Sequence, residues 1–545
     1  MKNLEKGAAL TDADPKVLLM EQFLLDGHSL SLQKVFDFLG NPASFELQIS
    51  GKSRKKVAKA RKQLEQWITK DKKVIYGITT GLGKLKDYIV SEEEQTVFQR
   101  NILYSHAVGL GHCFHQDIAK LAMLFRANVF CRGHSGVRPE LIDRLLLFIN
   151  KGIYPQLPQI GSLGVGDLQP MAHLGLCITG DREGQAWYKG KAGNITDILE
   201  EAGVVPVEFP LAAREALALM SGSTVLLAAA VYCCFQAVKL IAAADAAAAL
   251  NLEAVRGETN AFDLRIHEAR GLKTQIVSAQ NIQRLIEGSG WMTEEGRKRL
   301  SEMQPRVQDS VSLRSTCQVH GAVRDVLEYI RGVLQKEMNA STDNPLLFEG
   351  QESYESLSGG NFHGALLAYC MDFLGIVLTD LAVLSERRSA RLLDPVMSYG
   401  LPCNLVGGCA GLNTGFALVQ ADATALVGEM RILATPASVG SIPSKGNQED
   451  HNSMGMGAVR KAVRIIEHLK KVLAIEILCA AQAIDLISPQ MEGLSLGKGT
   501  QEIYKLVRRK APPMREDRYI RKDLLAVLEL VDSDDIINCT YIDRE

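Results

Sequence analysis

Beyond Pro210 the chain is dominated by long segments that contain no proline, at 211–255, 319–340, 365–393 and 458–487. In the second segment, apolar residues recur at intervals of three and four: Val319, Val323, Leu327, Ile330, Leu334 and Met338. This spacing places them on one face of a helix. The pattern predicts long amphipathic helices in the second half of the chain.

Two local features define how these helices pack and end. Residues 242–249 are all alanine except Asp245, so small side chains face nearly every direction, which is typical of a helix packed closely on all sides. The Asn344-Pro345 pair ends the 319–340 helix, because proline cannot continue it and restricts the residue before. Strand patterns are few. We therefore expect a mainly α protein with a long central helical bundle.

The organisation changes twice along the chain. Residues 1–210 mix short helical patterns with glycine-containing turns and predict a smaller N-terminal globular part. Residues 211–490 form the expected long-helix bundle, and residues 491–545 are a charged, partly helical C-terminal appendage.

The composition excludes several classes of function. The chain is 46% hydrophobic and 23% charged, with a formal net charge of −2, which offers no basic surface for nucleic acid and no polybasic anchor for a membrane. The longest apolar run, 224–238, is too short to cross a bilayer. The 11 cysteines are scattered without any C-x-x-C pair, and no apolar leader follows Met1. We expect a cytoplasmic protein with free thiols.

The usual signatures of cofactor and metal sites are missing. The chain has no Walker A loop, no dinucleotide-binding glycine motif after a strand, no H-E-x-x-H and no G-x-S-x-G. Its histidines lie singly, so we expect no metal site.

The candidate chemistry lies in polar islands between the long segments, rich in glycine and asparagine. Such loops commonly carry functional groups. The islands cover 76–83 (Tyr-Gly-Ile-Thr-Thr-Gly-Leu-Gly), 105–109 (Ser-His-Ala-Val-Gly), 161–168 (Gly-Ser-Leu-Gly-Val-Gly-Asp-Leu), 308–314 (Gln-Asp-Ser-Val-Ser-Leu-Arg), 358–364 (Ser-Gly-Gly-Asn-Phe-His-Gly) and 446–451 (Gly-Asn-Gln-Glu-Asp-His).

In this order, the islands resemble the hallmark segments of the histidine and aromatic amino-acid ammonia-lyase family, and the resemblance runs from about residue 70 to about residue 490. It implies a homotetramer whose long helices share one bundle and whose active sites combine several subunits. It also implies elimination of ammonia from an α-amino acid, through a methylidene-imidazolone electrophile that the family forms from an Ala-Ser-Gly tripeptide just before Asp-Leu.

At that position this chain departs from the family. It reads Gly164-Val165-Gly166-Asp167, so Val-Gly stands where Ala-Ser-Gly is expected. Val165 has no β-hydroxyl to lose, and Ser162 is followed by Leu163, whose side chain hinders the cyclisation that a glycine permits. Val311 replaces the family's tyrosine in its island. We predict that the methylidene-imidazolone is absent, that the chain has no cofactor, and that ordinary ammonia-lyase activity is doubtful.

Other positions retain the family pattern, and the resemblance implies their roles. Tyr76 matches the catalytic base, Arg314 the residue that holds the substrate carboxylate, and Phe362 a residue that packs on a planar ring. His106 and Glu449 resemble the histidine-specific branch and suit an imidazole ring. Ser221, where the family has asparagine, together with Asn361 and Gln448, completes the expected substrate site. Each of these residues has a purely structural alternative, such as a salt bridge for Arg314 or a subunit contact for Glu449.

Two functions follow from these observations. The first is a lyase that acts on a small planar imidazole- or aryl-bearing carboxylate, or an amino-acid-like ligand, by tyrosine-assisted elimination, addition or isomerisation. The second is a catalytically inactive paralogue that binds a ligand or assists assembly. Retention of Tyr76, His106, Arg314, Phe362 and Glu449 together favours the first, since a scaffold has no physical need for convergent polar groups.

Overall fold

The computed structural model describes residues 20–302, 306–351 and 353–540, and most of them are helical, as predicted. The helices are α1 (Leu32–Gly40), α2 (Gly51–Thr69), α3 (Gln95–His106), α4 (Gln116–Cys131), α5 (Pro139–Asn150), α6 (Leu168–Thr179), α7 (Ile195–Glu201), α8 (Glu215–Met220), α9 (Thr224–Val255), α10 (Leu264–Arg270), α11 (Lys273–Leu285), α12 (Glu294–Arg299), α13 (Val311–Arg314), α14 (Thr316–Glu337), α15 (Ala365–Leu392), α16 (Ala417–Leu433), α17 (Gly455–Ile487), α18 (Lys498–Lys510), α19 (Arg521–Asp532) and α20 (Asp535–Thr540).

The strands are short and lie outside the bundle. A parallel pair joins β1 (Glu21–Leu25) and β2 (Phe45–Ile49). The other sheets are antiparallel and comprise β3 (Leu110–Cys113) with β5 (Pro158–Ile160), β4 (Tyr154–Pro155) with β6 (Gln185–Tyr188) and β7 (Lys191–Asn194), and β8 (Leu346–Glu349) with β9 (Tyr354–Leu357).

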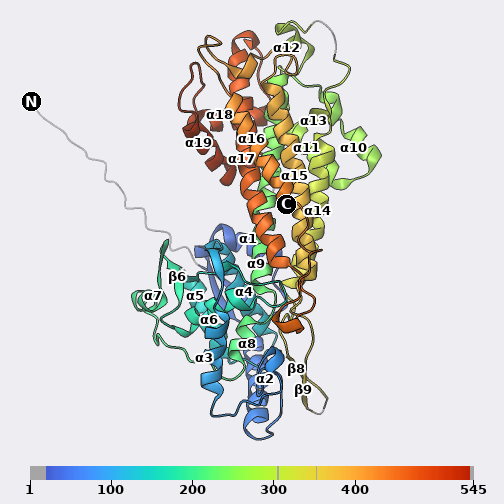
Figure 1. Ribbon diagram of the computed structural model, residues 1–545. Helices are drawn as coiled ribbons and strands as arrows, with labels where there is room; N and C mark the ends of the chain where they lie inside the picture. Colours follow the sequence, from blue (N-terminus) through green and yellow to red (C-terminus); the bar gives the residue numbers. More distant parts are fainter. Residues whose placement is uncertain (1–19, 303–305, 352, 541–545) are drawn as a thin grey trace, which may run out of the picture.

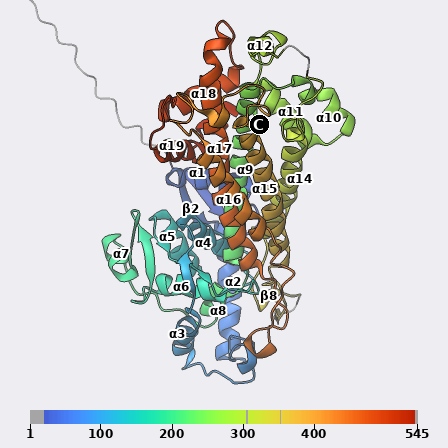
Figure 2. The same cartoon turned by 45° about the horizontal axis from the view of Figure 1, so that its top comes forward.

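The long helices α9, α14, α15, α16 and α17 form the expected central bundle, and the first third of the chain packs around one end of it (Figures 1 and 2). Helix α9 passes from that end through the bundle, and the alanines of 242–249 are at most 1% exposed, as close packing on all sides requires. On α14 the predicted apolar positions are buried, apart from the half-buried Val319. Helices α18, α19 and α20 pack against α9 and α17.

One predicted segment is not continuous. Residues 211–255 read as a single helical stretch, but α8 ends at Met220 and α9 begins at Thr224. Gly222 between them has a φ of 101°, and a Cβ on it would lie 2.4 Å from the carbonyl oxygen of Thr342. Only glycine fits this close approach. The resulting break lies at the cavity described below.

The apolar character of the long helices extends further than the 224–238 run indicated. Three of them, within 215–255, 365–392 and 455–491, are long and apolar enough to cross a membrane by length and composition alone. The expectation that 224–238 marks the limit of the apolar run was therefore wrong, because the helix continues through the alanine-rich stretch. Most of each apolar window, 78%, 61% and 78%, is buried inside the protein. Packing within the bundle accounts for this apolar character.

The buried carboxylate of Glu253, near the end of α9, connects three segments. It accepts hydrogen bonds from the hydroxyl of Ser289 at 2.7 Å, from the backbone N–H of Gly497 at 2.7 Å and from the hydroxyl of Thr500 at 2.9 Å. Gly497 is the residue that precedes α18. Burial raises the pKa of Glu253 to about 7, because the charged form is poorly solvated there.

This raised pKa predicts a pH-dependent stability. The folded protein holds the proton more tightly than the unfolded chain, so the stabilisation is complete below the ordinary pKa of glutamate and is lost as the pH rises through about 7. In Glu253→Gln the amide keeps the acceptor for Gly497 and Thr500. We expect this variant to gain about 2–3 kcal/mol relative to the wild type between pH 5 and pH 8.5. Urea unfolding at both pH values measures the difference. Parallel pH profiles for the two proteins would contradict it.

Candidate functional site

The 161–168 island lies between β5 and α6, where it contacts the starts of two bundle helices. The carbonyl oxygen of Gly164 accepts hydrogen bonds from the N–H of Gly364 at 2.9 Å and from the hydroxyl of Ser453 at 2.8 Å. Gly364 directly precedes α15, and Ser453 lies two residues before α17. The N–H of Gly166 donates to the carbonyl of Phe362 at 3.1 Å. Two distant islands, 358–364 and 446–451, are thereby placed beside the loop.

Asp167 connects the loop to two more helices. Its carboxylate is fully buried and accepts hydrogen bonds from the hydroxyl of Ser162 at 2.7 Å and from the N–H of Leu226, in the first turn of α9, at 2.9 Å. Asp167 itself precedes α6. Burial raises the pKa of this carboxyl group. Since α6, α9, α15 and α17 all begin here, their positive N-terminal ends converge on the loop, an arrangement that favours a negatively charged ligand.

A cavity of about 560 Å³ opens beside this loop. Among its lining residues are seven that the sequence predicts for the site: Tyr76, His106, Val165, Gly166, Ser221, Phe362 and Glu449. They come from six separate parts of the chain, so folding has brought the islands together. Apolar side chains, among them Leu82, Phe98 and Leu217, complete the walls.

The remaining predicted residues lie elsewhere. Gly164 and Asp167 are buried behind the cavity wall rather than on it. Asn361 lines a different hollow and donates to the carbonyl of Ser341 at 3.2 Å. Gln448 is exposed and does not line the cavity.

Arg314 is not brought to the cavity within one chain. It lies on the short helix α13, at the opposite end of the bundle from α8 and β8 (Figure 1). The 32-residue helix α9 that separates the two ends is about 48 Å long. The Nε atom of Arg314 is buried and has no hydrogen-bond partner among the described residues.

His106 and Tyr76 present polar groups to the cavity from neighbouring segments. The Nδ1 atom of His106, at the end of α3, lies 2.8 Å from the carbonyl of Ile102 and 2.9 Å from the hydroxyl of Ser105. Burial lowers the pKa of His106, so the ring is neutral near pH 7. With Nδ1–H donating to Ile102, Nε2 is an acceptor. The phenolic oxygen of Tyr76 accepts a hydrogen bond from the N–H of Gly83 at 3.1 Å.

Glu449 is the one carboxylate among the lining residues. Its Oε1 lies 3.2 Å from the ammonium of Lys445, whereas its Oε2 is buried and has no partner among the described residues. A buried unpaired carboxylate oxygen costs free energy and suits a hydrogen-bond donor on a ligand.

Sequence reasoning missed four polar lining residues, Lys84, Asn101, Asn344 and Lys445. Lys84 and Lys445 each lie one residue outside an island that was recognised, so a wider window would have included them. Asn344 was predicted to end a helix and was given no role in the site. Its N–H donates to the hydroxyl of Ser221 at 3.1 Å, which places the break after α8 against the 342–345 turn.

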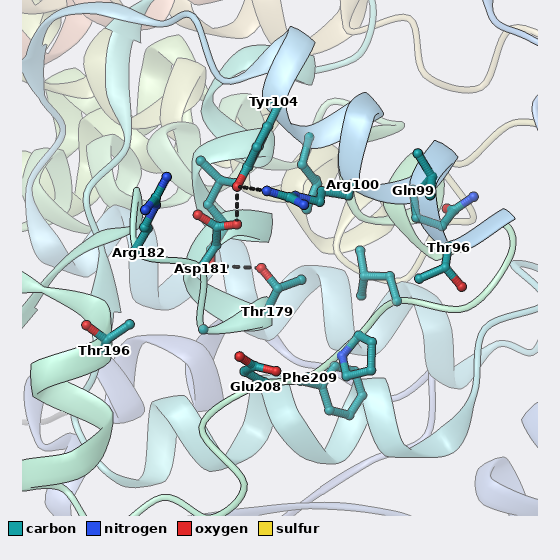
Figure 3. A pocket seen from close by; sticks show the side chains of 16 residues that line it. Thr96, Gln99, Arg100, Tyr104, Thr179, Asp181, Arg182, Thr196, Glu208 and Phe209 are labelled. Atoms are coloured by element: carbon teal, nitrogen blue, oxygen red, sulfur yellow. Dashed lines mark hydrogen bonds between the residues drawn. The ribbon is translucent and has the colours of Figure 1, made fainter. Parts of the chain in front are cut away.

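A second cavity, of about 540 Å³, is lined partly by residues of α3 and α6 (Figure 3). Three of its polar groups pair with one another: the Tyr104 hydroxyl donates to Asp181 at 2.7 Å and accepts from Arg100 at 3.1 Å. None of the residues predicted for the site lines it. The cavity beside the 161–168 loop is therefore the candidate active site.

Comparison with known proteins identifies the class. The sequence profile of the aromatic amino acid lyase family matches residues 30–509. A histidine ammonia-lyase from Alkaliphilus oremlandii is 42% identical over 95% of this chain and 98% of its own length.

Solved structures agree. Histidine ammonia-lyase from Trypanosoma cruzi has a TM-score of 0.84 at 33% identity, covering 95% of both chains. The ergothioneine-degrading enzyme ergothionase from Treponema denticola has a TM-score of 0.86 at 28% identity, covering 95% of this chain and all of that one. The protein belongs to the aromatic amino acid lyase family, the family of the histidine ammonia-lyases, and is a lyase of that superfamily.

The residues of the loop do not fit the family's methylidene-imidazolone. Between Gly164 and Gly166 stands Val165, which carries no β-leaving group. The hydroxyl of Ser162 donates to Asp167 and accepts from the N–H of Gly164 at 3.1 Å, which is a structural role. The Gly166 nitrogen and the Gly164 carbonyl, the atoms that would have to join, each hydrogen-bond to the 362–364 segment.

The buried position of Asp167 leads to a stability prediction. Asp167→Ala leaves the N–H of Leu226 and the hydroxyl of Ser162 without their acceptor inside the core, and we expect a loss of about 3–5 kcal/mol. Asp167→Asn retains one acceptor oxygen and should lose less than half as much. Ser162→Ala, which removes the hydrogen bond to Asp167 and the one from the Gly164 N–H, should cost about 1–2 kcal/mol. Denaturant titration measures all three. Equal stability of Asp167→Ala and the wild type would refute the role given to this carboxylate.

Proposed function

We propose that the protein is a lyase that binds a planar imidazole- or aryl-bearing carboxylate in the cavity and acts without a methylidene-imidazolone. The observation that carries the proposal is the convergence of Tyr76, His106, Phe362 and Glu449 on one cavity, with a buried carboxylate oxygen left unpaired. A carboxylate such as Glu449 and a neutral imidazole acceptor such as His106 can both hydrogen-bond the N–H groups of a ligand ring.

The chemistry follows from the missing electrophile. An α-ammonium group leaves poorly beside a weakly acidic β-hydrogen, so elimination without an electrophile requires a better leaving group than ammonia. Tyr76 is the candidate proton acceptor, and addition or isomerisation needs the same group. The similarity to ergothionase supports this proposal, since that enzyme of the same fold degrades ergothioneine rather than histidine, phenylalanine or tyrosine. We therefore regard the chain as a divergent member of its family.

Arg314 enters the site from another copy of the chain in this proposal, and the assembly is a homotetramer. The bundle offers a suitable surface: Leu366, Tyr369, Phe373 and Ile376 lie at helical spacing on α15 and are each 43–46% exposed. Apolar rows of this kind are commonly covered in an oligomer. Within the same proposal Ser221 binds the substrate from the cavity wall, and the protein is cytoplasmic. Substrate binding by Asn361 and Gln448 stays a prediction, since the cavity of one chain includes neither residue.

The alternative is a catalytically inactive paralogue that binds a ligand or assists assembly. The replacement of the cofactor-forming tripeptide by Val165-Gly166 favours it. The unpaired Glu449 oxygen favours a ligand in both cases, so only turnover separates the two functions.

The first prediction of this proposal concerns the covalent state of the loop. Residues 164–167 should be ordinary peptide, because no residue there can lose a β-hydroxyl. Intact-protein mass spectrometry should give the mass calculated from the sequence. A deficit of two water molecules that maps to this loop, or robust formation of urocanate from histidine, would contradict it.

The second prediction concerns ligand binding. Urocanate or an arylacrylate should bind, and Arg314→Ala should weaken binding by roughly thirtyfold or more, since removing one partner of a buried charge pair costs about 2–5 kcal/mol. Glu449→Gln should weaken urocanate more than cinnamate. Tyr76→Phe should leave binding nearly intact and abolish any turnover.

Calorimetry on these variants is the measurement, with the exposed Arg265→Ala as a matched control. Light scattering should report a tetramer. If Arg314→Ala binds the ligands as tightly as the wild type, or if the protein is a stable monomer, the site is not shared between subunits. If the wild type binds no planar carboxylate, the proposed enzymatic function is wrong.

A further inference from the structure

The turn that carries Glu449 has an unusual backbone. Three successive residues, Lys445, Gly446 and Asn447, are left-handed, with φ values of 48°, 61° and 64°. The N–H of Ser444 donates to the carbonyl of Glu449 at 2.9 Å and closes the turn. A left-handed lysine costs about 1–2 kcal/mol. Such a conformation persists where the surroundings require it, and here it sets the position of the Lys445 side chain.

The turn brings two ammonium groups to the cavity. The side chain of Lys84, the residue that follows the 76–83 island, lies against Gly446. A Cβ on Gly446 would be 2.6 Å from the Nζ of Lys84. Gly446 therefore permits the approach of Lys84. Lys445 pairs with Glu449 at 3.2 Å, and its side chain remains 41% exposed. Among the described residues Lys84 makes no ion pair.

These charges do not balance. The lining residues include two ammonium groups, Lys84 and Lys445, and one carboxylate, Glu449. His106 adds no charge, because burial lowers its pKa and the nearby Lys445 acts in the same direction. One positive charge is left over at the Glu449 end of the cavity, before any residue of another copy is counted. An exposed ion pair of this kind contributes about 1 kcal/mol or less, so a ligand can separate it easily.

We propose that Lys445 is a specificity-determining residue and that the cavity prefers a planar carboxylate whose ring carries a second acidic group. The inference rests on the proposed function, in which Arg314 of another copy holds the first carboxylate and Glu449 faces the ring. Lys445 leaves Glu449 and binds the acidic substituent, while Lys84 adds to the positive electrostatic potential at this end of the cavity. The ligand then neutralises the charge that the chain leaves unpaired.

The test compares two ligands that differ by one carboxylate, cinnamate and 4-carboxycinnamate. Wild-type protein should bind 4-carboxycinnamate at least tenfold more tightly by calorimetry. Lys445→Gln should abolish this preference and leave cinnamate within about twofold, whereas Lys445→Arg should retain it. Lys86→Gln, an exposed lysine nearby that does not line the cavity, is the matched control.

Glu449→Gln should change the affinity for 4-carboxycinnamate in the opposite direction to Lys445→Gln. Removing the competing carboxylate frees Lys445, so this variant should bind 4-carboxycinnamate several times more tightly than the wild type. A merely structural role for Lys445 would change both ligands alike. Equal binding of the two ligands by the wild type, or an unchanged preference in Lys445→Gln, would overturn the inference and leave the proposed function standing. Absence of binding by both ligands and by urocanate would overturn both.

Discussion

The buried carboxylate of Asp167 is the interaction on which the arrangement of the site depends. It accepts hydrogen bonds from the N–H of Leu226 at the start of α9 and from Ser162 within its own loop. Because Gly164 and Gly166 bond to the segments that precede α15 and α17, four helix starts meet at one loop. A helix start has backbone N–H groups without internal partners. The convergence therefore creates a positive region inside an apolar bundle, and the cavity opens directly beside it.

The sequence pattern predicted the bundle well where packing follows periodicity. The apolar face of α14 and the alanine-rich part of α9 depend only on side-chain size and spacing, both of which can be read along the chain. The break between α8 and α9 could not be read in this way, because Ser221, Gly222 and Ser223 are compatible with a helix. A contact from a distant part of the chain, the Thr342 carbonyl close to Gly222, imposes it.

The same distinction applies to the site. Tyr76, His106, Phe362 and Glu449 were predictable because each lies in an island that resembles a hallmark segment of the family, and folding brings these segments to one cavity. Lys445 was not, since a lysine one residue outside an island is indistinguishable from a solvated surface residue until the turn is seen. For Arg314 the sequence motif was recognised, but its place in the single chain was not. The bundle of a single chain places Arg314 far from the cavity (Figure 1).

A cavity that works without an electrophile, as we propose for this protein, can still favour charge separation. When a proton is removed beside a carboxylate, negative charge develops on the ligand, and fixed positive groups lower the energy of that state without rearranging. Here the groups are the starts of α6, α9, α15 and α17 together with Lys84 and Lys445. Their effect is strongest where the walls exclude water, as the apolar side chains of Leu82, Phe98 and Leu217 do. In the proposed reaction the protein thus contributes electrostatic stabilisation, and the leaving group must supply the reactivity that the family otherwise obtains from its electrophile.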